Sequence, residues 1–230
     1  MQLLEAAAAF SGAFLENAGL YQNQQEMFLG SLKALTAAID AKDRYTCGHS
    51  ERVALMAREL ALASGMPSAQ ADRVHIAGLL HDVGKIGVPE AVLCKAGRLT
   101  DAEFALIRLH PEIGHRILKD IPMLGDILPG VLNHHERWDG KGYPQGLSGL
   151  GIPHVARLLA IADTFDAMSS TRSYRPAMSR ERVMAEIRKE AGRQFDPELA
   201  ACFAGLDLTH YDRMVARHAV EHTHPLTAAA

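Results

Sequence analysis

The stretch Leu79-Leu80-His81-Asp82-Val83-Gly84-Lys85-Ile86-Gly87, residues 79–87, is the starting point for interpreting the chain. An apolar segment ends here by placing an imidazole, a carboxylate and an ammonium close together in the sequence. Each of these groups is costly to remove from water unless it is paired or ligates a metal ion. The stretch therefore predicts metal chemistry beside an anionic substrate, at the end of a helix.

Outward from this stretch, the hydrophobic pattern is helical almost everywhere. Thr100 and Glu103 have the spacing of a capping box, and the helix that they open must stop or bend before Pro111. We expect helices over residues 3–41, 55–64, 68–83, 101–110, 123–136, 153–170, 179–191 and 196–204, with the helix over 123–136 kinked or restarted at Pro129. No segment shows a convincing period-two alternation of a strand, so the expected fold class is all-α.

Composition excludes several classes of protein. The chain has 230 residues, 48% of them hydrophobic and 22% charged, which is ordinary for a soluble globular protein. A net charge of −3 argues against a nucleic acid polymer as partner, because such a partner needs a basic surface. The three cysteines form no C-x-x-C pair and suit a reducing compartment. No apolar stretch reaches the length of a membrane span and no signal peptide is evident, so we expect a cytoplasmic protein without membrane insertion.

Further candidate metal ligands lie at predicted helix ends or on core-facing helices. They are His49, His110, His134, His135 and Asp163. Taken singly, such a histidine is more often a hydrogen-bonded core residue, and a lone aspartate is more often a helix cap. Together with His81 and Asp82 they form a ligand set for two metal ions with one bridging carboxylate.

These residues belong to an ordered series of motifs. The series runs Asp43-x-Tyr45-Thr46-x-Gly48-His49, His81-Asp82-Val83-Gly84-Lys85-Ile86-Gly87-Val88-Pro89, His110-Pro111-Glu112-Ile113-Gly114, His134-His135-Glu136-Arg137-Trp138-Asp139-Gly140-Lys141-Gly142-Tyr143-Pro144 and Arg172-Ser173-Tyr174-Arg175. It resembles the HD-GYP phosphodiesterases, a branch of the HD metal-dependent phosphohydrolases. The resemblance covers residues 32–203 and implies an HD-superfamily helical bundle.

The resemblance implies two metal ions whose ligand sets share Asp82 as a bridge. The sets are His49, His81, Asp82 and Asp163 for one ion, and His110, His134 and His135 with Asp82 for the other. Ligands without thiolate favour iron or manganese over structural zinc. Some family members bind a third ion through a glutamate where this chain has Tyr45, so we expect only two ions here. Glu136 is a candidate hydrogen-bond partner for a ligating histidine.

Catalysis is expected from the metal-bound water together with Asp82 and Lys85. Two cations that share a bridging water lower its pKa, and the resulting hydroxide attacks the phosphorus. The ammonium of Lys85 should point at the phosphate. By resemblance, the substrate-binding residues are Asp43, Lys85, Tyr143, Arg172 and Arg175. For Asp43 the alternative is a role at the end of a helix or in orienting a ligand. The spacing of the two arginines suits bidentate phosphate contact on one side of a helical turn, with a surface salt bridge as the alternative.

The substrate class comes from the resemblance alone. It implies hydrolysis of the bacterial second messenger cyclic di-GMP to pGpG, and onward to GMP. Nothing in the sequence distinguishes guanine from adenine, so cyclic GMP-AMP is the nearest alternative. A non-catalytic cyclic-dinucleotide receptor that recruits partner proteins is a second alternative, although every ligand of the dinuclear site is present. An HD nucleotidase is a third, against which Gly142-Tyr143-Pro144 argues.

The two ends of the chain need separate hypotheses. Residues 1–30 faintly resemble the last helix of a GAF sensory domain, which implies an upstream sensory domain and a helix able to pair in a homodimer. A packing helix with no sensor is the alternative. Residues 31–205 are expected to form the phosphodiesterase domain. After Leu208 the helical pattern fades, so residues 206–230 are expected to be a frayed helical tail.

Overall fold

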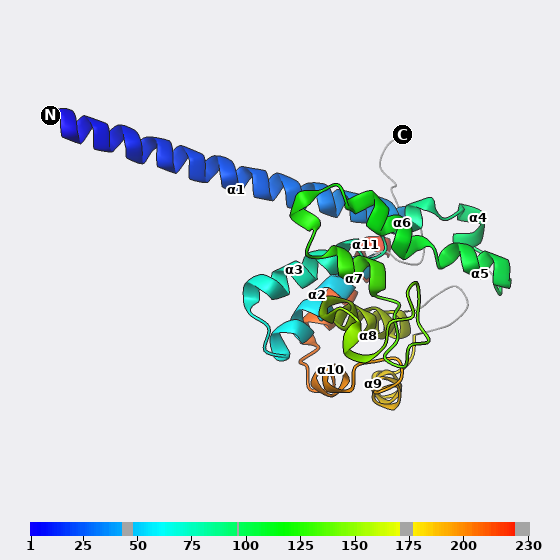
Figure 1. Ribbon diagram of the computed structural model, residues 1–230. Helices are drawn as coiled ribbons and strands as arrows, with labels where there is room; N and C mark the ends of the chain where they lie inside the picture. Colours follow the sequence, from blue (N-terminus) through cyan, green and yellow to red (C-terminus); the bar gives the residue numbers. More distant parts are fainter. Residues whose placement is uncertain (43–47, 96, 171–176, 224–230) are drawn as a thin grey trace. The chain divides into compact units, whose positions relative to one another are not determined.

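The computed structural model describes residues 1–42, 48–95, 97–170 and 177–223 (Figure 1). Its α-helices are α1 (Gln2–Lys42), α2 (His49–Ala63), α3 (Ser68–Leu80), α4 (Glu90–Leu93), α5 (Asp101–Ile107), α6 (His110–Leu118), α7 (Leu128–Asn133), α8 (His154–Ser169), α9 (Arg180–Lys189), α10 (Pro197–Phe203) and α11 (Thr209–Thr223). Three short 3-10 helices are η1 (Val83–Gly87), η2 (Pro122–Leu124) and η3 (Gly149–Gly151). No strand occurs within the described ranges, which confirms the all-α class.

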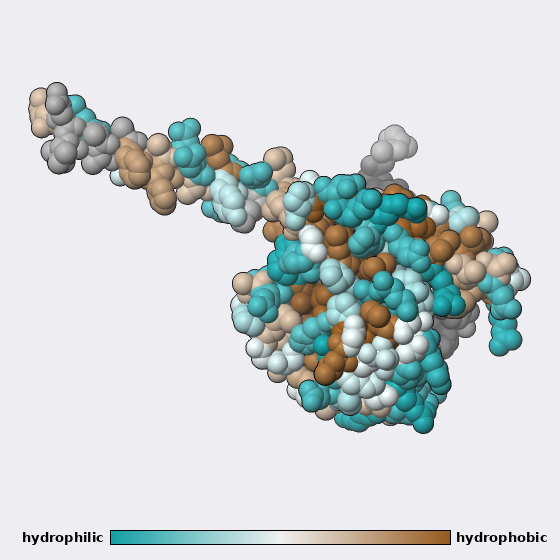
Figure 2. All heavy atoms as spheres, in the orientation of Figure 1, coloured by the Kyte–Doolittle hydropathy of each residue, from teal (hydrophilic) through white to brown (hydrophobic). Residues whose placement is uncertain are grey.

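The chain divides into two compact units, Met1–Leu35 and Thr36–Ala230. The first unit is the larger part of α1, and its exposed apolar side chains include Phe10, Phe14 and Met27. The second unit holds all the other helices. Figure 2 shows hydrophilic and hydrophobic residues mixed over the face of this unit that it presents. Among the described helices, none has the length and apolar character that crossing a membrane requires.

Helix α8 is the centre of the second unit. It contacts α2, α3, α7, α9 and α10, and Figure 1 shows α2, α7 and α8 side by side. Leu158, Ile161 and Phe165 on α8 are fully buried, and each contributes about 1.5–3 kcal/mol relative to an exposed side chain. A carboxylate on such a helix is costly without a partner. Asp163 and Asp166 of α8 must therefore find partners inside the core.

The break between α5 and α6 follows from local sequence signals. Glu103 N donates to Thr100 Oγ1 at 3.3 Å, and Thr100 N donates to Glu103 Oε2 at 2.7 Å, so the predicted capping box is confirmed. Helix α5 ends at Ile107, and α6 begins at His110 with Pro111 in its first turn. The restart places His110 at the beginning of a helix.

Two predicted helices are shorter than expected. The helix expected over residues 123–136 is divided into η2 and α7, and Pro129 lies in the first turn of α7, where its missing N–H leaves no helical bond unmade, so the predicted restart at this proline is confirmed. Helix α3 ends at Leu80, and the chain tightens into η1 at Val83. This earlier end places His81 and Asp82 between two helices.

The C-terminal segment differs most from its prediction. We expected a frayed helical tail, and Thr209–Thr223 does form a helix, α11, but this helix is packed into the core: Tyr211 and His218 on it are 1% and 8% exposed. The prediction was wrong here because the two side chains are buried by contacts with distant residues, which no local pattern reveals.

Candidate metal centre

The predicted metal ligands meet where several helices begin or end. Two histidines begin helices, two directly follow helices, and one aspartate lies within α8. They are His49 (α2) and His110 (α6), His81 (after α3) and His134 (after α7), and Asp163, with Asp82 and His135 next in sequence to His81 and His134. The structure thus brings all seven residues into one region.

Asp82 is shared by two groups of ligand atoms. The groups are Asp82, His110, His134 and His135, and His49, His81 and Asp82, with the ligand atoms of each group within 4.8 Å of one another. Asp82 Oδ1 lies 3.2 Å from His110 Nε2, and Asp82 Oδ2 lies 3.3 Å from His81 Nε2. The two oxygens of one carboxylate face different groups, as a bridging ligand requires.

His81, His110 and His134 are held by the same kind of backbone contact. In each ring, Nδ1 lies 2.7, 2.7 and 2.9 Å, respectively, from the carbonyl oxygen three residues earlier. A carbonyl only accepts hydrogen bonds, so Nδ1 carries the proton and Nε2 presents its lone pair. The Nε2 atoms of His110 and His134 are 3.2 Å apart. Two lone pairs at this separation repel each other unless a cation lies between them.

His49 is held by carboxylates instead. Its Nδ1 lies 2.7 Å from Asp166 Oδ2, and its Nε2 lies 3.2 Å from Asp163 Oδ1 and 3.8 Å from Asp82 Oδ2. Asp166 is fully buried and also accepts hydrogen bonds from Arg52 at 2.6 and 3.0 Å. A histidine that donates to a carboxylate through one nitrogen keeps the other nitrogen free to ligate.

Burial and charge set the protonation of these groups. Burial lowers the pKa of His134 well below its usual value, and burial together with the charge of His110 lowers the pKa of His135 to about 4. Burial opposes the charge on Asp82, but the Lys85 ammonium together with His81 and His110 outweighs it and holds the pKa of Asp82 well below its usual range. The centre therefore offers neutral imidazoles at His134 and His135 beside an ionised carboxylate, the forms that metal binding requires.

The donor set fits a divalent metal ion. His81 Nε2 is buried and makes no hydrogen bond with a protein atom. Imidazole nitrogens and carboxylate oxygens together suit divalent transition metals. Two groups resist: hydrogen bonds to Asp163 and Asp166 overcome the effect of burial and raise the pKa of His49 to about 9, and the charge of Asp82 overcomes burial and raises the pKa of His81. A metal ion bound there displaces a proton.

Comparison with known proteins agrees with this geometry. Residues 33–199 match the family described as the HD domain. The chain belongs to the HD domain family. Its relatives include 3'3'-cGAMP-specific phosphodiesterase 2 of Vibrio cholerae, 36% identical over 94% of this chain and 41% of the relative. They also include the cyclic di-GMP phosphodiesterase of Thermotoga maritima, 36% identical over 81% of this chain and 51% of the relative. The cyclic di-GMP phosphodiesterase response regulator RpfG of Xanthomonas campestris is 38% identical over 73% of this chain and 45% of the relative.

The chain spans about half the length, or less, of these curated relatives. Their names confirm the resemblance to the HD-GYP phosphodiesterases that the motifs indicate. Among solved structures, a cyclic GMP-AMP-specific phosphodiesterase of V. cholerae, V-cGAP3, aligns with a TM-score of 0.61 over 81% of this chain and 50% of its own. An HDGYP protein of Bdellovibrio bacteriovorus, Bd1817, aligns with a TM-score of 0.55 over 68% of this chain and 50% of its own. Both are 18% identical and show that the helical fold is shared.

Gly84 allows the HD domain to bring Asp82 to His110. A Cβ at this position would overlap the backbone carbonyl of His110 and lie 2.5 Å from the backbone nitrogen of Gly114. Helices η1 and α6 therefore approach more closely than a larger residue permits. This approach carries Asp82 Oδ1 to within 3.2 Å of the His110 ring.

Lys85 lies beside the shared carboxylate. Its Nζ is 2.7 Å from Asp82 Oδ2, and its side chain is 15% exposed. It lines a cavity of about 410 Å³ over the centre, together with His49, Asp82, His110, His135, Tyr143 and Asp163. The ammonium of Lys85 is thus held by Asp82 in the lining of the cavity. Its contact with phosphate stays a prediction.

Tyr143 forms one side of this cavity. Its ring stacks on His135 with centroids 4.8 Å apart, and the guanidinium carbon of Arg108 lies 4.6 Å from the centroid of the Tyr143 ring. Tyr143 N also donates to His135 O at 3.2 Å. Gly142 permits this folding of the loop, because a Cβ there would collide with the backbone of Glu136 and Arg137. The Gly-Tyr-Pro loop is therefore attached to a candidate ligand.

Glu136 has a different role from the one predicted. Its carboxylate accepts hydrogen bonds from the backbone nitrogens of Gln145, Gly146 and Leu147 at 2.6, 3.0 and 3.0 Å. The prediction that it contacts a ligating histidine was wrong, since the buried carboxylate holds the loop that follows Tyr143.

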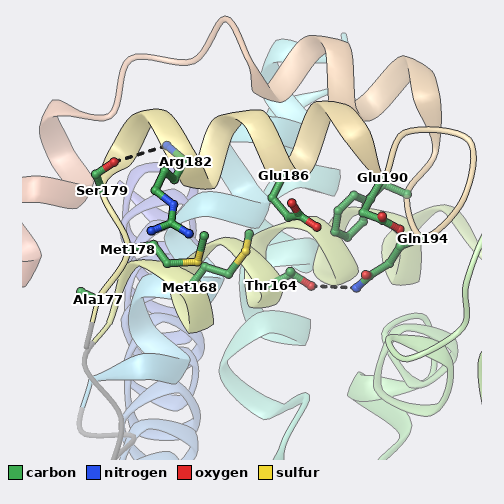
Figure 3. A pocket seen from close by; sticks show the side chains of 10 residues that line it. Thr164, Met168, Ala177, Met178, Ser179, Arg182, Glu186, Glu190 and Gln194 are labelled. Atoms are coloured by element: carbon green, nitrogen blue, oxygen red, sulfur yellow. Dashed lines mark hydrogen bonds between the residues drawn. The ribbon is translucent and has the colours of Figure 1, made fainter. Parts of the chain in front are cut away.

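A second and larger cavity adjoins the first. It measures about 690 Å³ and shares Thr164, Met168 and Gln194 with the cavity over the centre. Figure 3 shows Glu186 and Glu190 directed into it from α9, and Gln194 hydrogen-bonded to Thr164 of α8. Space for a ligand therefore continues from the candidate metal centre along α8.

The loop at Trp138 is joined to the same wall. Trp138 N donates to Gln194 O at 3.1 Å, and Gly149 N donates to Trp138 O at 3.0 Å. The half-buried Trp138 thus links the Gly-Tyr-Pro loop to Gln194, a residue of both cavities.

Some predicted residues lie outside the described ranges. They are Asp43, Tyr45, Arg172 and Arg175. The substrate contacts of three of them, and the limit of two ions inferred from Tyr45, stay predictions.

The sequence predicted no role for Asp166, Arg52 or Arg108. Asp166 follows Asp163 by three residues on α8, so helical spacing places both carboxylates on one face. That spacing was a usable signal for Asp166. Arg108 on Tyr143 joins residues distant in the sequence, and no local signal predicts it.

Proposed function

We propose that this HD domain hydrolyses cyclic di-GMP to pGpG, and onward to GMP, in the bacterial cytoplasm. The observation that carries the proposal is the position of Asp82. Its two oxygens face two groups of ligand atoms, and Lys85 and an open cavity lie directly beside it. A phosphodiester seated in this cavity meets positive charge from several directions.

We further propose that the centre holds two divalent ions, iron or manganese. One binds to His49, His81, Asp82 and Asp163, and the other to His110, His134, His135 and Asp82. Divalent ions supply positive charge that polarises a phosphodiester and lowers the pKa of water. The protein's own contribution is to keep His110, His134 and His135 neutral through burial, to orient the ligating rings and to exclude bulk water from the buried side.

We assign Lys85 as the catalytic side chain that stabilises the negative charge of the phosphate. Its ammonium already lies at 2.7 Å from Asp82 Oδ2, so substrate binding needs only a small movement to bring it to a phosphoryl oxygen. Tyr143 forms a flat wall for the substrate, supported by His135 and Arg108. Asp43, Arg172 and Arg175 are the remaining proposed substrate contacts.

Cyclic GMP-AMP is the second candidate substrate. A relative that matches 94% of this chain carries the name 3'3'-cGAMP-specific phosphodiesterase, whereas others are named for cyclic di-GMP. The two adjoining cavities suit a dinucleotide with either base. The non-catalytic receptor is the alternative from another functional class.

The test is metal content coupled to product analysis. The full chain is purified anaerobically with iron or manganese, and equal amounts of cyclic di-GMP and 3'3'-cGAMP are offered separately and in competition. We expect pGpG from cyclic di-GMP and the higher kcat/KM for that substrate. Faster turnover of 3'3'-cGAMP would favour the second candidate. A fully metallated sample that binds cyclic di-GMP and never cleaves it would favour the receptor.

We propose that residues 1–30 are a signalling helix below an upstream sensory domain, and that this helix pairs in a homodimer. Relatives about twice as long as this chain and the exposed Phe10, Phe14 and Met27 support the idea. The phosphodiesterase domain starts at about residue 31, and the burial of Tyr211 extends it beyond residue 205 to α11. Light scattering after size exclusion should give a dimer for the chain and a monomer for Phe14→Glu. A monomeric parent chain would contradict the pairing.

A further inference from the structure

We propose that α11 is a positioning element for the metal centre, because Tyr211 and His218 complete a buried network that fixes the ring of His49. Helix α11 lies beyond residues 33–199, which match the HD domain family. The inference rests on the proposed function in one respect, namely that His49 is a metal ligand.

The carboxylate of Asp166 is the junction of this network. Oδ2 lies 2.7 Å from His49 Nδ1 and 3.0 Å from the Nη2 of Arg52. Oδ1 accepts from Arg52 Nε at 2.6 Å and from the Tyr211 hydroxyl at 2.8 Å. Ser170 Oγ is more distant, at 3.4 Å. A carboxylate offers about four lone-pair sites, so the four short bonds saturate it, and Tyr211 supplies the fourth.

Saturation fixes the direction in which Asp166 faces. The side chains of Asp166 and Arg52 are 1% and 7% exposed, so water cannot replace a missing donor. If the Tyr211 hydroxyl is removed, one lone pair of Oδ1 stays buried without a partner. The carboxylate can then rotate to share the remaining donors, and the bond from His49 Nδ1 loses its fixed direction.

His218 secures the other side of the network. Its Nδ1 lies 3.2 Å from the Nη1 of Arg52, which can only donate, so Nδ1 must accept. The proton is then on Nε2, which lies 3.3 Å from Glu51 Oε2. The ring also packs directly on Gly48, where an added Cβ would overlap it. Gly48 has a φ of 67° and immediately precedes His49, so the ring of His218 covers the turn that starts α2.

The packing role and the hydrogen-bonding role of Tyr211 are separable. Its ring packs on Phe165 with centroids 4.9 Å apart, and the Arg180 guanidinium carbon lies 5.3 Å from its centroid. Only the hydroxyl reaches Asp166. Tyr211→Phe therefore keeps the ring and removes the single contact on which the inference depends.

The test is the affinity of the full chain for Mn²⁺, measured by equilibrium dialysis with elemental analysis. Removing a residue that hydrogen-bonds directly to a metal ligand typically lowers metal affinity by about 10–100-fold. Tyr211 does not touch His49 itself but acts through Asp166, so a smaller effect is expected. We expect Tyr211→Phe to weaken the site of His49 by about 3- to 10-fold. We expect the second Mn²⁺ to bind as in the parent chain, because His110 and His134 are held by backbone carbonyls.

The matched control is Phe203→Leu. Phe203 packs on the same Phe165 ring, with centroids 5.0 Å apart, but does not reach Asp166. We expect this variant to lower the melting temperature of the metal-free protein without changing either Mn²⁺ affinity. A second pair tests His218: His218→Leu should weaken the site of His49, and His218→Asn should restore it, because the Asn oxygen can accept from Arg52 in place of Nδ1.

The outcomes distinguish this inference from the proposed function. If the parent chain binds Mn²⁺ and hydrolyses cyclic di-GMP while Tyr211→Phe binds Mn²⁺ equally well, only the role of α11 is overturned. The same holds if Phe203→Leu weakens Mn²⁺ binding as much as Tyr211→Phe. If Tyr211→Phe weakens binding in a chain that never hydrolyses a cyclic dinucleotide, the inference stands and the proposed function fails. A parent chain that binds no metal overturns both.

Discussion

The ring of His49 and the rings of His110 and His134 occupy one centre but are oriented by different chemistry. His110 and His134 each donate from Nδ1 to a carbonyl of their own local turn. His49 donates to the carboxylate of Asp166, which is itself held by side chains from α2 and α11. A backbone carbonyl is present whatever the side chains are, whereas a carboxylate network depends on each member. The rings of His110 and His134 are therefore oriented by helix formation itself, whereas the support of His49 is assembled from distant parts of the chain.

Removing the residue common to both ligand groups should have the largest effect. We expect Asp82→Ala to release metal from both groups and to lower kcat/KM by about 10³-fold, more than the 10–100-fold typical of an outer partner. Elemental analysis and cyclic di-GMP turnover measure the two effects. Asp120→Ala, at an exposed position, is the control and should change neither. Retention of a full metal complement in Asp82→Ala would show that the two groups are not linked through this carboxylate.

Lys85→Ala should separate catalysis from metal binding. The ammonium contributes charge beside Asp82, and removing one such stabilising group typically costs about 10²–10³-fold in turnover. We expect a loss of about 10²-fold in kcat with the metal content of the parent chain. Lys95→Ala is the matched control, since Lys95 also bonds a carboxylate, that of Glu103 at 2.6 Å, but lines no part of the cavity. Unchanged turnover in Lys85→Ala would remove the proposed role.

Asp166→Asn should weaken metal binding only at the ligand group that contains His49, because the Asp166 carboxylate orients that ring. His49 donates to Oδ2, and Arg52 Nε donates to Oδ1. The amide keeps the shape of the carboxylate but replaces one of these acceptor oxygens with a donor, so it cannot satisfy both contacts. We expect the affinity of the His49 group for Mn²⁺ to fall by about 10–100-fold and that of the His110 group to stay within error. Titration of Mn²⁺ with two resolved binding steps provides the readout. An equal loss at both steps would contradict the division described above.

The position of His110 relative to Asp82 should be sensitive to a substitution that displaces the backbone. Gly84→Ala places a methyl group against the carbonyl of His110, and overpacking of this kind costs about 1–3 kcal/mol in the free energy of unfolding. Urea denaturation of the metal-free protein measures it. Gly151→Ala is the control, because a Cβ at Gly151 meets no atom within 4 Å. If both variants are equally stable, the close approach of η1 and α6 does not constrain the centre.

The same contrast explains what the sequence could predict. The all-α class and the capping box at Thr100 follow from spacings of three and four residues, and both were predicted. The candidate ligands were also named in advance, because each lies in a short motif. His81, His110 and His134 even carry their hydrogen-bond partners three residues away.

The support of His49 could not be predicted in this way. Asp166 is 117 positions from His49, and His218 is 166 positions from Arg52. Nothing near Tyr211 in the sequence indicates that its hydroxyl is buried against a carboxylate of α8. Such contacts are consequences of tertiary packing, so a helix that the sequence pattern describes as frayed can still be part of the core.

The linkage of Trp138 to Gln194 gives the protein a built-in optical probe. The chain contains a single tryptophan, so its fluorescence comes from one known place. Its backbone is bonded to Gln194, which lines both cavities, and it lies on the loop that carries Tyr143. We therefore expect emission from this indole to change when a ligand arrives beside α8, which would follow binding in real time without a label and without turnover.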